Sequence, residues 1–584
     1  MTDRMRTEHP RPDMFRKSWV SLNGEWEFAE DPGDSGAERG MQNADAPADL
    51  FGLRINLPFC RESDLSGLGH RDFCDAVWYR KEIMLSEGWL EDGKRLILHI
   101  GACDWQATVW VNGKLACDHF GGYTPIRADI TRFCEEGENV ITVRARDYLR
   151  SENQAAGKQS LAYGSHGCHY TRTTGIWQSV WLESLPSAHV VRFRVYPDVP
   201  GCTVTLVADV KAPDGALLSA YASYEGKPVG NASGRVSGGV AALKIPLSEL
   251  HLWEIGEGRL YDLRLSLTGA GEFDDELEGY FGMRSVQVKD GFVLLNGKKI
   301  FQRLVLDQGF YPDGIYTAPS DDELRADIER SMACGFNGAR LHQKIFEPRF
   351  LWYADRLGYI VWGEAGNWGM DIARREAWAA FIPEWTECIA RDFNHPSIIG
   401  WCPLNETQRN QDVLFVRALA SVTRSIDPTR AYIDTSGWTH VEGLSDIVDN
   451  HDYDQDPVSF RARYDAQTGA GTPVDTRHSP FPVVSTFVSE YGGIRWAPEG
   501  EGWGYGNAPK DGDEFIARFC GLTDALLDNP KIGGLCYTQL TDVEQEVNGL
   551  YTYGRKAKFP PEIFKEILTR TAACELPEES GQNE

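Results

Sequence analysis

The first third of the chain contains short runs in which apolar and polar residues alternate. This pattern is typical of strands with one buried face. The alternating runs begin at Arg80, Arg95, Ala107, Val140 and Val180. Asn112-Gly113 follows the third run directly, and Asn-Gly is a strong signal for a hairpin turn. We find no amphipathic helix pattern in this stretch. Residues 12–185 therefore predict a β-sandwich.

Residues 186–283 continue with short strands at regular spacing. The clearest runs span residues 190–195, 204–210 and 261–267. A stretch of about 100 residues with this spacing suggests an immunoglobulin-like sandwich, although no paired cysteines accompany it.

The pattern changes after residue 297, where helices begin to alternate with strands. Ser320-Asp-Asp-Glu323 is a capping box that opens a helix, and Gly335 is placed to end it. A second helix begins at Pro348 and ends at Gly358. This alternation separates the last part of the chain from the two sandwiches.

Eight strands are predicted in this last part. They span residues 300–306, 338–341, 359–362, 398–401, 431–434, 447–450, 483–488 and 534–539. Helical stretches such as 412–426 and 513–527 separate most of them, but the connection between the fifth and sixth is not clearly helical. Eight strand–helix units predict a (β/α)8 barrel over residues 284–575.

Composition excludes several classes of protein. The 59 Lys and Arg against 86 Asp and Glu give a net charge of −27, which disfavours binding to nucleic acid or to an anionic membrane. No run of about 18 apolar residues predicts a membrane span, and the first residues lack the apolar core of a secretory signal. Thirteen scattered cysteines without CxxC spacing indicate free thiols. We therefore expect a cytoplasmic homo-oligomer.

The chemistry of such a barrel gathers at the C-terminal ends of its strands. Polar residues stand at these predicted ends: Asp307, Gln308, Arg340, His342, Glu364, Asn405, Glu406, Asp434, His451, Tyr453, Glu490, Tyr537, Gln539 and Asp542. Glu406 and Glu490 follow the fourth and seventh strands and face each other across a barrel. Two carboxylates about 5–5.5 Å apart are what a retaining glycosidase needs. A single glutamate at a strand end is usually a solvated loop residue. Each of these two follows an apolar strand and has polar or aromatic neighbours, which favours a catalytic role for the pair.

The motifs around these glutamates resemble those of glycoside hydrolase family 2, the β-galactosidase, β-glucuronidase and β-mannosidase family. Asn405-Glu406 is similar to its acid/base motif, in which the Asn binds the sugar 2-hydroxyl. Ser489-Glu490-Tyr-Gly is similar to its nucleophile motif. The resemblance implies that Tyr453 hydrogen-bonds the nucleophile and that Tyr537 lies in the floor of the sugar site.

The resemblance extends over nearly the whole chain, in the family's order. Matching segments begin at Leu22, Val77, Val111, His119, Gly175, Phe281 and Leu295. It implies an N-terminal jelly-roll domain over residues 12–185, an immunoglobulin-like sandwich over 186–283 and the catalytic barrel over 284–575.

Departures from the family pattern concern the substrate more than the reaction. Arg340-Leu-His342 has its His one position early, and His169 stands where galactosidases and glucuronidases place an Asp. The Asn-x-Lys motif of glucuronidases has no clear match near Asn548. Glu364 lacks the neighbouring His of Mg²⁺-dependent relatives, so we expect no metal and no cofactor, and a second-layer hydrogen-bonding role for this carboxylate.

We expect a retaining exo-glycosidase acting on a glycoside or oligosaccharide, with a β-galactoside as the first choice of sugar. A β-glucuronide, β-galacturonide, galactofuranoside or arabinofuranoside stays open. Besides Asn405, Tyr453 and Tyr537, the expected substrate-binding residues are Asp307, Arg340, His342, Glu364, His169 and Arg172. Two other classes, a carbohydrate-binding protein on an inactive barrel and a metal-dependent barrel hydrolase, fit less well. The first predicts that one carboxylate is missing, and the second needs a His cluster on the first barrel strand.

Overall fold

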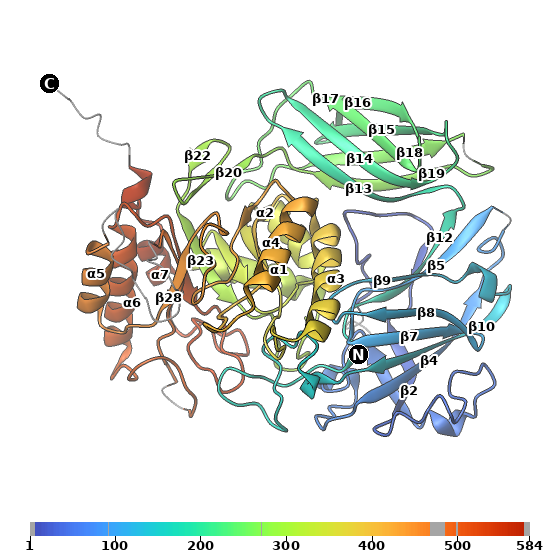
Figure 1. Cartoon of the computed structure of the whole chain (residues 1–584), viewed down its shortest axis with the longest axis horizontal. Coiled ribbons are helices and arrows are strands. Elements are labelled where there is room, and N and C mark those ends of the chain that lie inside the picture. The colour runs from blue at the N-terminus through green and yellow to red at the C-terminus, as the bar shows by residue number, and fades with distance from the viewer. Residues whose placement is uncertain (1–5, 92, 270, 468–484, 498–499, 577–584) are drawn as a thin grey trace.

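A computed structural model describes residues 6–467 except 92 and 270, then residues 485–497 and 500–576. Figure 1 shows three parts: a sandwich at the N-terminus, a second sandwich beside it, and a barrel of strands and helices. The two sandwiches lie on the same side of the molecule, at the right and top of Figure 1, and the barrel lies at the left.

The N-terminal part consists of two main antiparallel sheets. One has the order β3-β2-β4-β10-β7-β8 and the other β1-β12-β5-β9. Their strands are β1 (Trp19–Ser21), β2 (Gly24–Glu30), β3 (Leu53–Leu57), β4 (Ala76–Leu85), β5 (Lys94–Ile100), β7 (Gln106–Val111), β8 (Lys114–Phe120), β9 (Ile126–Asp129), β10 (Gly137–Arg146) and β12 (Val180–Pro186), with a small pair β6 (Cys103–Asp104) and β11 (Gly175–Ile176). The predicted hairpin joins β7 to β8, with Asn112 and Gly113 at φ of 49° and 75°.

The second sandwich packs a three-stranded sheet, β13-β14-β17, against a four-stranded sheet, β16-β15-β18-β19. Its strands are β13 (His189–Asp198), β14 (Thr203–Lys211), β15 (Leu217–Tyr224), β16 (Lys227–Arg235), β17 (Val240–Pro246), β18 (Tyr261–Thr268) and β19 (Asp275–Phe281). A short sheet of β20 (Val286–Lys289), β21 (Phe292–Leu295) and β22 (Lys298–Lys299) then leads into the barrel.

The barrel contains eight parallel strands in the order β27-β26-β25-β24-β23-β30-β29-β28, as the sequence predicts. They are β23 (Gln302–Asp307), β24 (Gly338–Leu341), β25 (Ile360–Glu364), β26 (Ile398–Cys402), β27 (Ala431–Tyr432), β28 (Asp449–Asp452), β29 (Phe487–Gly492) and β30 (Gly534–Thr538). The start of the seventh predicted strand, at residues 483–484, lies outside the described residues. No helix separates β27 from β28 in this described stretch.

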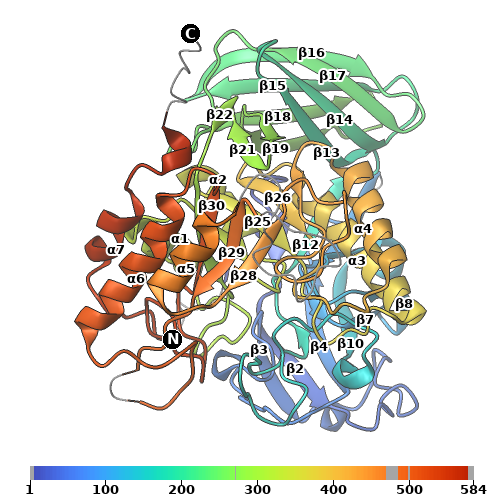
Figure 2. The ribbon, with the colours of Figure 1, turned by 60° about the vertical axis from the view of Figure 1, so that its left-hand side comes forward.

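Seven helices surround the described strands of the barrel, and Figure 2 shows α1, α5, α6 and α7 on one side of it. They are α1 (Asp321–Ala333), α2 (Pro348–Leu357), α3 (Arg375–Asp392), α4 (Val413–Ile426), α5 (Pro457–Asp465), α6 (Gly512–Leu527) and α7 (Pro561–Leu568). The Ser320 side chain accepts a hydrogen bond from the Glu323 amide, which caps α1 as predicted. Gly358, at φ 66°, ends α2.

Alternation along each strand divides the barrel residues between two environments. Leu304, Trp362 and Phe487 belong to a buried cluster in the barrel interior. Val305 and Tyr537 belong to a different cluster, together with residues of the surrounding helices. A side chain at a strand end therefore faces either the interior or the helices according to its parity, which decides what reaches the site.

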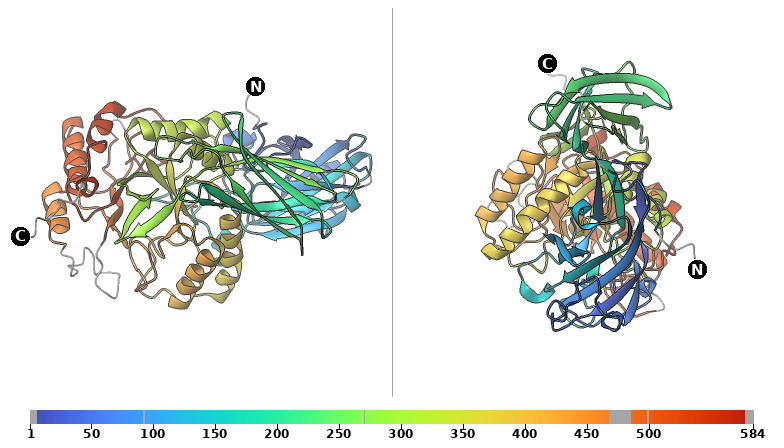
Figure 3. Two further views of the ribbon diagram at one scale, coloured as in Figure 1. Left: turned by 90° about the horizontal axis from the view of Figure 1, so that it is seen from above. Right: turned by 90° about the vertical axis from the view of Figure 1, so that its right-hand side faces the viewer.

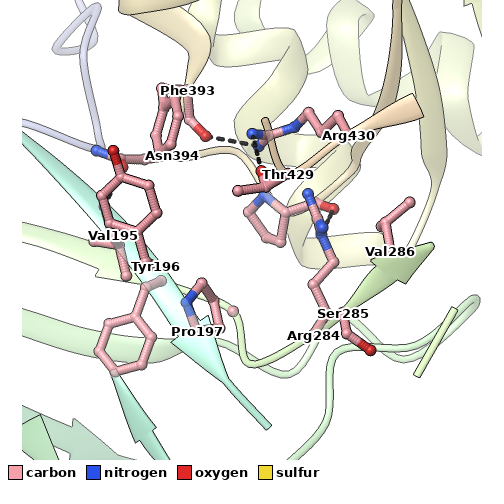
Figure 4. A pocket seen from close by; sticks show the side chains of 13 residues that line it. Val195, Tyr196, Pro197, Arg284, Ser285, Val286, Phe393, Asn394, Thr429 and Arg430 are labelled. Carbon is pink, nitrogen blue, oxygen red and sulfur yellow. Dashed lines mark hydrogen bonds between the residues drawn. The ribbon is translucent and has the colours of Figure 1, made fainter. Parts of the chain in front are cut away.

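A cavity of about 200 Å³ marks the joint between the second sandwich and the barrel. Figure 4 shows its lining, which includes Tyr196 from the sandwich and Arg430 from the barrel. Arg284 and Arg430 there donate to backbone carbonyls, among them that of Ile398. Because the cavity adjoins the segments that precede β26 and β27, it lies at the end of the barrel opposite to the expected site.

The segment between β10 and β11 leaves the N-terminal sandwich and contacts the barrel. The Ala156 amide donates to the carbonyl of Trp368, and the Gly157 amide donates to that of Gly366. The views in Figure 3 show the N-terminal sandwich packed directly beside the barrel. In the described part of the chain, no helix is long and apolar enough to cross a membrane.

Candidate active site

The two glutamates come together at the C-terminal ends of the barrel strands. Glu490 lies in β29, and Glu406 follows β26 in a left-handed conformation, with φ of 50°. One oxygen of each carboxylate and one ring nitrogen of His451 lie within 4.8 Å of one another. A separation this short leaves no room for a water molecule to attack a sugar bound between the two groups.

Glu490 is buried and is held by positive and hydroxyl-bearing groups. Arg340 lies 3.1 Å from its Oε1, and Tyr453 donates a hydroxyl hydrogen bond to Oε2. Burial alone would raise the pKa of Glu490, but His451, His342 and Arg340 outweigh it and hold that pKa well below its usual range. Glu490 is therefore an anion at neutral pH, which a nucleophile requires.

A fully buried ion pair lies beneath these carboxylates. Arg340 places one guanidinium nitrogen 2.6 Å from Oε2 of Glu364, and His342 places Nδ1 2.9 Å from Oε1. Burial raises the pKa of Glu364, but Arg340 and His342 together lower it to about 2. Burial lowers the pKa of His342, and Glu364 and Glu490 offset this shift only in part. Glu364 thus compensates Arg340 and is not free to bind a metal.

Asn405 presents an unused amide donor in the site. Its Oδ1 accepts a hydrogen bond from Arg340 at 3.1 Å, and its backbone amide donates to Asn367. Its buried Nδ2 has no acceptor among the described residues. The Trp368 indole donates to the Asn405 carbonyl, which fixes the residue from behind. Asn405 is therefore positioned to donate to a substrate hydroxyl.

Tyr453 lines the site together with an aromatic neighbour. Its ring stacks on Tyr505 with centroids 3.4 Å apart and planes 3° from parallel. Its hydroxyl also lies 3.1 Å from Oγ1 of Thr538, at the end of β30. Tyr505 lies in the loop after β29. No motif marks this loop, so the sequence analysis did not predict Tyr505 as a site residue.

The N-terminal sandwich contributes to the site through residues 157–172. His169 lies at 5.5 Å from the Trp368 ring, and burial together with Lys158 lowers its pKa to about 4. Tyr170 donates to Glu546, a buried carboxylate on the loop after β30. Burial raises the pKa of Glu546, and Lys158 lowers it in part. This loop joins the sandwich to the mouth of the barrel.

Lys158 is a site residue that the sequence analysis missed. It is 7% exposed, and its ammonium group lies 4.0 Å from the centroid of the Trp368 ring. Burial lowers its pKa, but Cys168, Glu546, Glu490 and Glu406 together raise it. No hydrogen-bond or ion-pair partner of this ammonium is found among the described residues. A single Lys in a loop carries no sequence motif that would have revealed it.

Three of the expected substrate-binding residues do not reach the site. Asp307 faces Asp327, Arg555 and Lys344 outside the strands, and Gln308 takes the inward position beside Tyr170. The ring of Tyr537 packs on Phe519 of α6, and Thr538 points inward instead. Arg172 donates to the carbonyls of Arg71, Ala162 and Tyr163 within its own domain. Strand alternation explains the first two, because each expected residue is one position away from the inward one.

The cluster of Glu406, His451 and Glu490 offers three donor atoms of the kind that bind divalent cations. These atoms already contact one another, however, since His451 Nδ1 lies 2.6 Å from Glu406 Oε1 and its Nε2 lies 3.4 Å from Glu490 Oε1. The imidazole thus occupies the space between the carboxylates that a metal ion would need.

Three family models match the chain in sequence order. "Glycosyl hydrolases family 2, sugar binding domain" matches residues 68–186, "Glycosyl hydrolases family 2" matches residues 188–284, and "Glycosyl hydrolases family 2, TIM barrel domain" matches residues 286–467. The matched residues follow the three parts seen in the structure and end before Glu490.

Among curated proteins, the chain is similar to a β-glucuronidase of Paenibacillus borealis, with 25% identity over 448 residues that cover 72% of this chain and 73% of that protein. It is 26% identical over 453 residues to the β-glucuronidase of Sus scrofa, covering 70% of this chain and 67% of that protein. A solved structure of Ruminococcus gnavus β-glucuronidase shares the fold at a TM-score of 0.76 and 20% identity, covering 94% of this chain and 98% of the other. The Lactobacillus rhamnosus β-glucuronidase gives 0.78 and 18%, covering 96% and 98%. The chain belongs to glycoside hydrolase family 2, and it is a retaining O-glycosyl hydrolase.

Proposed function

We propose that this enzyme removes a terminal β-linked hexuronic acid from a glycoside, with Glu490 as nucleophile and Glu406 as acid/base. The nearest carboxylate oxygens lie at most 4.8 Å apart, which supports these two catalytic roles. The Lys158 ammonium has no hydrogen-bond or ion-pair partner among the described residues, which supports a negatively charged sugar. This choice replaces the β-galactoside that the sequence first favoured.

The first half of the reaction forms a bond between Glu490 and the sugar. An oxygen of Glu490 attacks the anomeric carbon while the bond to the leaving-group oxygen breaks and Glu406 gives that oxygen a proton. Arg340 and Tyr453 keep Glu490 ionised and oriented before the attack. The Asn405 amide is positioned for the sugar 2-hydroxyl, where hydrogen bonds strengthen in the transition state.

The second half returns both carboxylates to their starting states. Glu406, now ionised, takes a proton from water as the water oxygen attacks the anomeric carbon and the ester bond to Glu490 breaks. Two displacements at one carbon retain the anomeric configuration. An inverting enzyme would need its carboxylates about 6.5–9.5 Å apart to hold the water between them.

A uronic acid carries a carboxylate that a buried cation stabilises strongly. Lys158 supplies such a cation, because its ammonium group is almost fully buried and has no partner among the described residues other than the Trp368 ring. It lies over the Trp368 ring, whose indole donates to the Asn405 carbonyl, and Glu490 and Glu406 contribute to raising its pKa. The curated relatives described above are β-glucuronidases, which supports the same choice.

One feature favours a neutral sugar as the second candidate. The loop after β30 carries Glu546 and Asn548, where glucuronidases of the family carry Asn-x-Lys. Asn548 donates to Glu546 at 3.0 Å, so this pair is internally satisfied and offers no cation. A β-galactoside, galactofuranoside or arabinofuranoside would then use Glu546 and Lys158 as acceptor and donor for its hydroxyls.

A panel of p-nitrophenyl glycosides tests the proposal, with β-glucuronide, β-galacturonide, β-galactoside, β-galactofuranoside and α-arabinofuranoside compared by kcat/KM. We expect a uronide to lead. Lys158→Met should lower uronide kcat/KM by about 10- to 100-fold, the usual range for a lost charged hydrogen bond, and Lys158→Arg should keep more activity than Lys158→Met. A leading neutral pyranoside or furanoside would overturn the choice of sugar.

A further inference from the structure

His451 lies between the two catalytic glutamates and contacts both of them. Its Nδ1 lies 2.6 Å from Oε1 of Glu406, and its Nε2 lies 3.4 Å from Oε1 of Glu490. The imidazole is buried, with 2% of its side chain exposed. It pairs with Glu490 in the ladder between β28 and β29, where the strand register shifts. Such irregularities often re-aim side chains next to active sites.

The surroundings of this ring are built to hold it in one orientation. Ser436 Oγ lies 3.1 Å from Nε2, and Arg340 lies 3.5 Å from the same nitrogen. Gly437, at φ 91°, packs against the ring, and a Cβ there would approach the ring atoms to 2.4 Å. The Glu406 amide donates to the Ser436 carbonyl at 2.9 Å. The loop after β27 thus positions both the imidazole and the acid/base residue.

The groups that face His451 are Glu406, Glu490, Arg340 and Ser436. Burial lowers the pKa of His451, but Glu490 and Glu406 outweigh it, and the net shift is upward. Both carboxylates thus favour the protonated, positively charged form of the imidazole. This form screens the repulsion that the two carboxylates would otherwise exert on each other.

We propose that His451 is a positioning residue for the proton transfer: its Nδ1–H donates to Oε1 of Glu406 and so leaves Oε2 as the oxygen that exchanges a proton with the substrate. The inference rests on the proposed acid/base role of Glu406. It concerns how that role is prepared, and it does not make His451 a group that touches the substrate.

The proton balance of the cycle is unchanged by this assignment. When the glycosidic bond breaks, the Oε2–H bond of Glu406 breaks and an O–H bond forms on the leaving group. The new negative charge on Glu406 is then stabilised by the Nδ1–H of His451 through a charge-assisted hydrogen bond. In the second half, Oε2 takes a proton from the attacking water. His451 keeps its own protons throughout.

The arrangement has two consequences that a purely structural role lacks. Without His451 the ionised Glu406 carboxylate loses a charge-assisted hydrogen-bond donor, so the group gives up its proton less readily. Substrates that need a strong acid, because their leaving groups are poor, should suffer most. Activated leaving groups depart without a proton, so the turnover of substrates that carry them should fall least.

The test compares His451→Asn, His451→Gln and His451→Ala on aryl glycosides of the preferred sugar with graded leaving groups. The Asn amide can occupy the place of Nδ1, and the longer Gln amide that of Nε2, so they form a matched pair. For His451→Ala we expect kcat to fall by about 10²- to 10³-fold with an unactivated leaving group and by less than about tenfold with dinitrophenol.

His451→Asn should recover at least about tenfold of the loss with the poor leaving group, whereas His451→Gln should not. Equal losses across all leaving groups, or equal behaviour of Asn and Gln, would each overturn the inference. If His451→Ala fails to fold by circular dichroism, the comparison of Asn with Gln decides. If the wild type retains configuration and the His451 variants show none of these effects, this inference alone is refuted. An inverting wild type would instead refute the proposed roles of the glutamates.

Discussion

Arg340 binds Glu364 through one guanidinium nitrogen at 2.6 Å and reaches Glu490 through the other at 3.1 Å. The arginine therefore compensates Glu364, which keeps its charge, and stabilises Glu490, which we propose as the nucleophile. When Glu490 becomes an ester and loses its charge, Glu364 keeps Arg340 paired. The guanidinium is thus never left as an isolated buried charge, a state that costs several kcal/mol.

Treatment with EDTA should leave activity within about twofold of the untreated enzyme. Arg340 and His342 satisfy Glu364, and His451 occupies the space between the catalytic carboxylates, so neither group of carboxylates is free for a metal. Initial rates before and after dialysis against EDTA provide the measurement. Strong inhibition that Mg²⁺ reverses would show that Glu364 binds a metal.

Replacing Glu490 with Ala should reduce kcat on the order of 10⁴-fold or more. In our proposal this side chain supplies the nucleophile, and the nearby Glu364 is already paired with Arg340 and His342. A 2-fluoro glycosyl fluoride should trap a covalent adduct on the peptide that contains Glu490. Mass spectrometry of the digested protein identifies the labelled residue, and a label on Glu364 would contradict the assignment.

Replacing Glu406 with Ala should separate its two tasks. An activated aryl glycoside should still glycosylate Glu490 and then stall, because no base activates the water. Added azide needs no base, so it should restore turnover and give a glycosyl azide with the configuration of the substrate. Nuclear magnetic resonance of the product reports the anomer. The opposite anomer would mean an inverting reaction in which Glu490 acts as a base.

Replacing Glu384 with Gln should raise the midpoint temperature of unfolding at pH 8 and leave it nearly unchanged at pH 5. Glu384 of α3 is buried against the N-terminal sandwich, where the Tyr123 amide donates to it at 3.0 Å. Burial raises its pKa to about 7. A carboxyl with a raised pKa is most favourable at low pH, and its contribution to stability is lost as pH rises through about 7.

Calorimetry of the Glu384→Gln variant across pH 4 to 9, compared with wild type, measures this effect, which should not exceed roughly 3 kcal/mol. Glu387→Gln, on a more exposed position of the same helix, is the matched control and should not remove the pH slope. A pH slope that survives in Glu384→Gln would assign it to other buried carboxyls.

The order of secondary-structure elements follows from local signals in the sequence. The Ser320 cap, the Gly358 helix end and the Asn112-Gly113 hairpin each depend on a few adjacent residues. Each can therefore be predicted from the local sequence alone. The fifth barrel strand is shorter than the predicted 431–434, because β27 pairs only through Ala431 and Tyr432. Its length depends on a neighbouring strand, which local patterns do not report.

Site residues that belong to a sequence motif could be predicted. Residues whose position depends on which side of a strand they occupy, or that come from a distant segment of the chain, could not. Glu406 and Glu490 each belong to a recognisable motif at the end of a predicted strand, and the structure brings their carboxylates together. Asp307 and Tyr537 are each one residue from the inward position, and the sequence does not fix where a strand begins to within one residue. Lys158 reaches the site from another domain, so no pattern within the barrel indicates it.

The loop of residues 157–172 belongs to the sandwich by chain order but lies against the mouth of the barrel. The reacting carboxylates and the cation that we assign to the sugar therefore lie on separately folded parts of one chain. Exchange of this loop between relatives would alter which glycoside is accepted without touching Glu406 or Glu490. The wall of the site that we assign to the choice of sugar can therefore change without any change in the barrel strands that position Glu406 and Glu490.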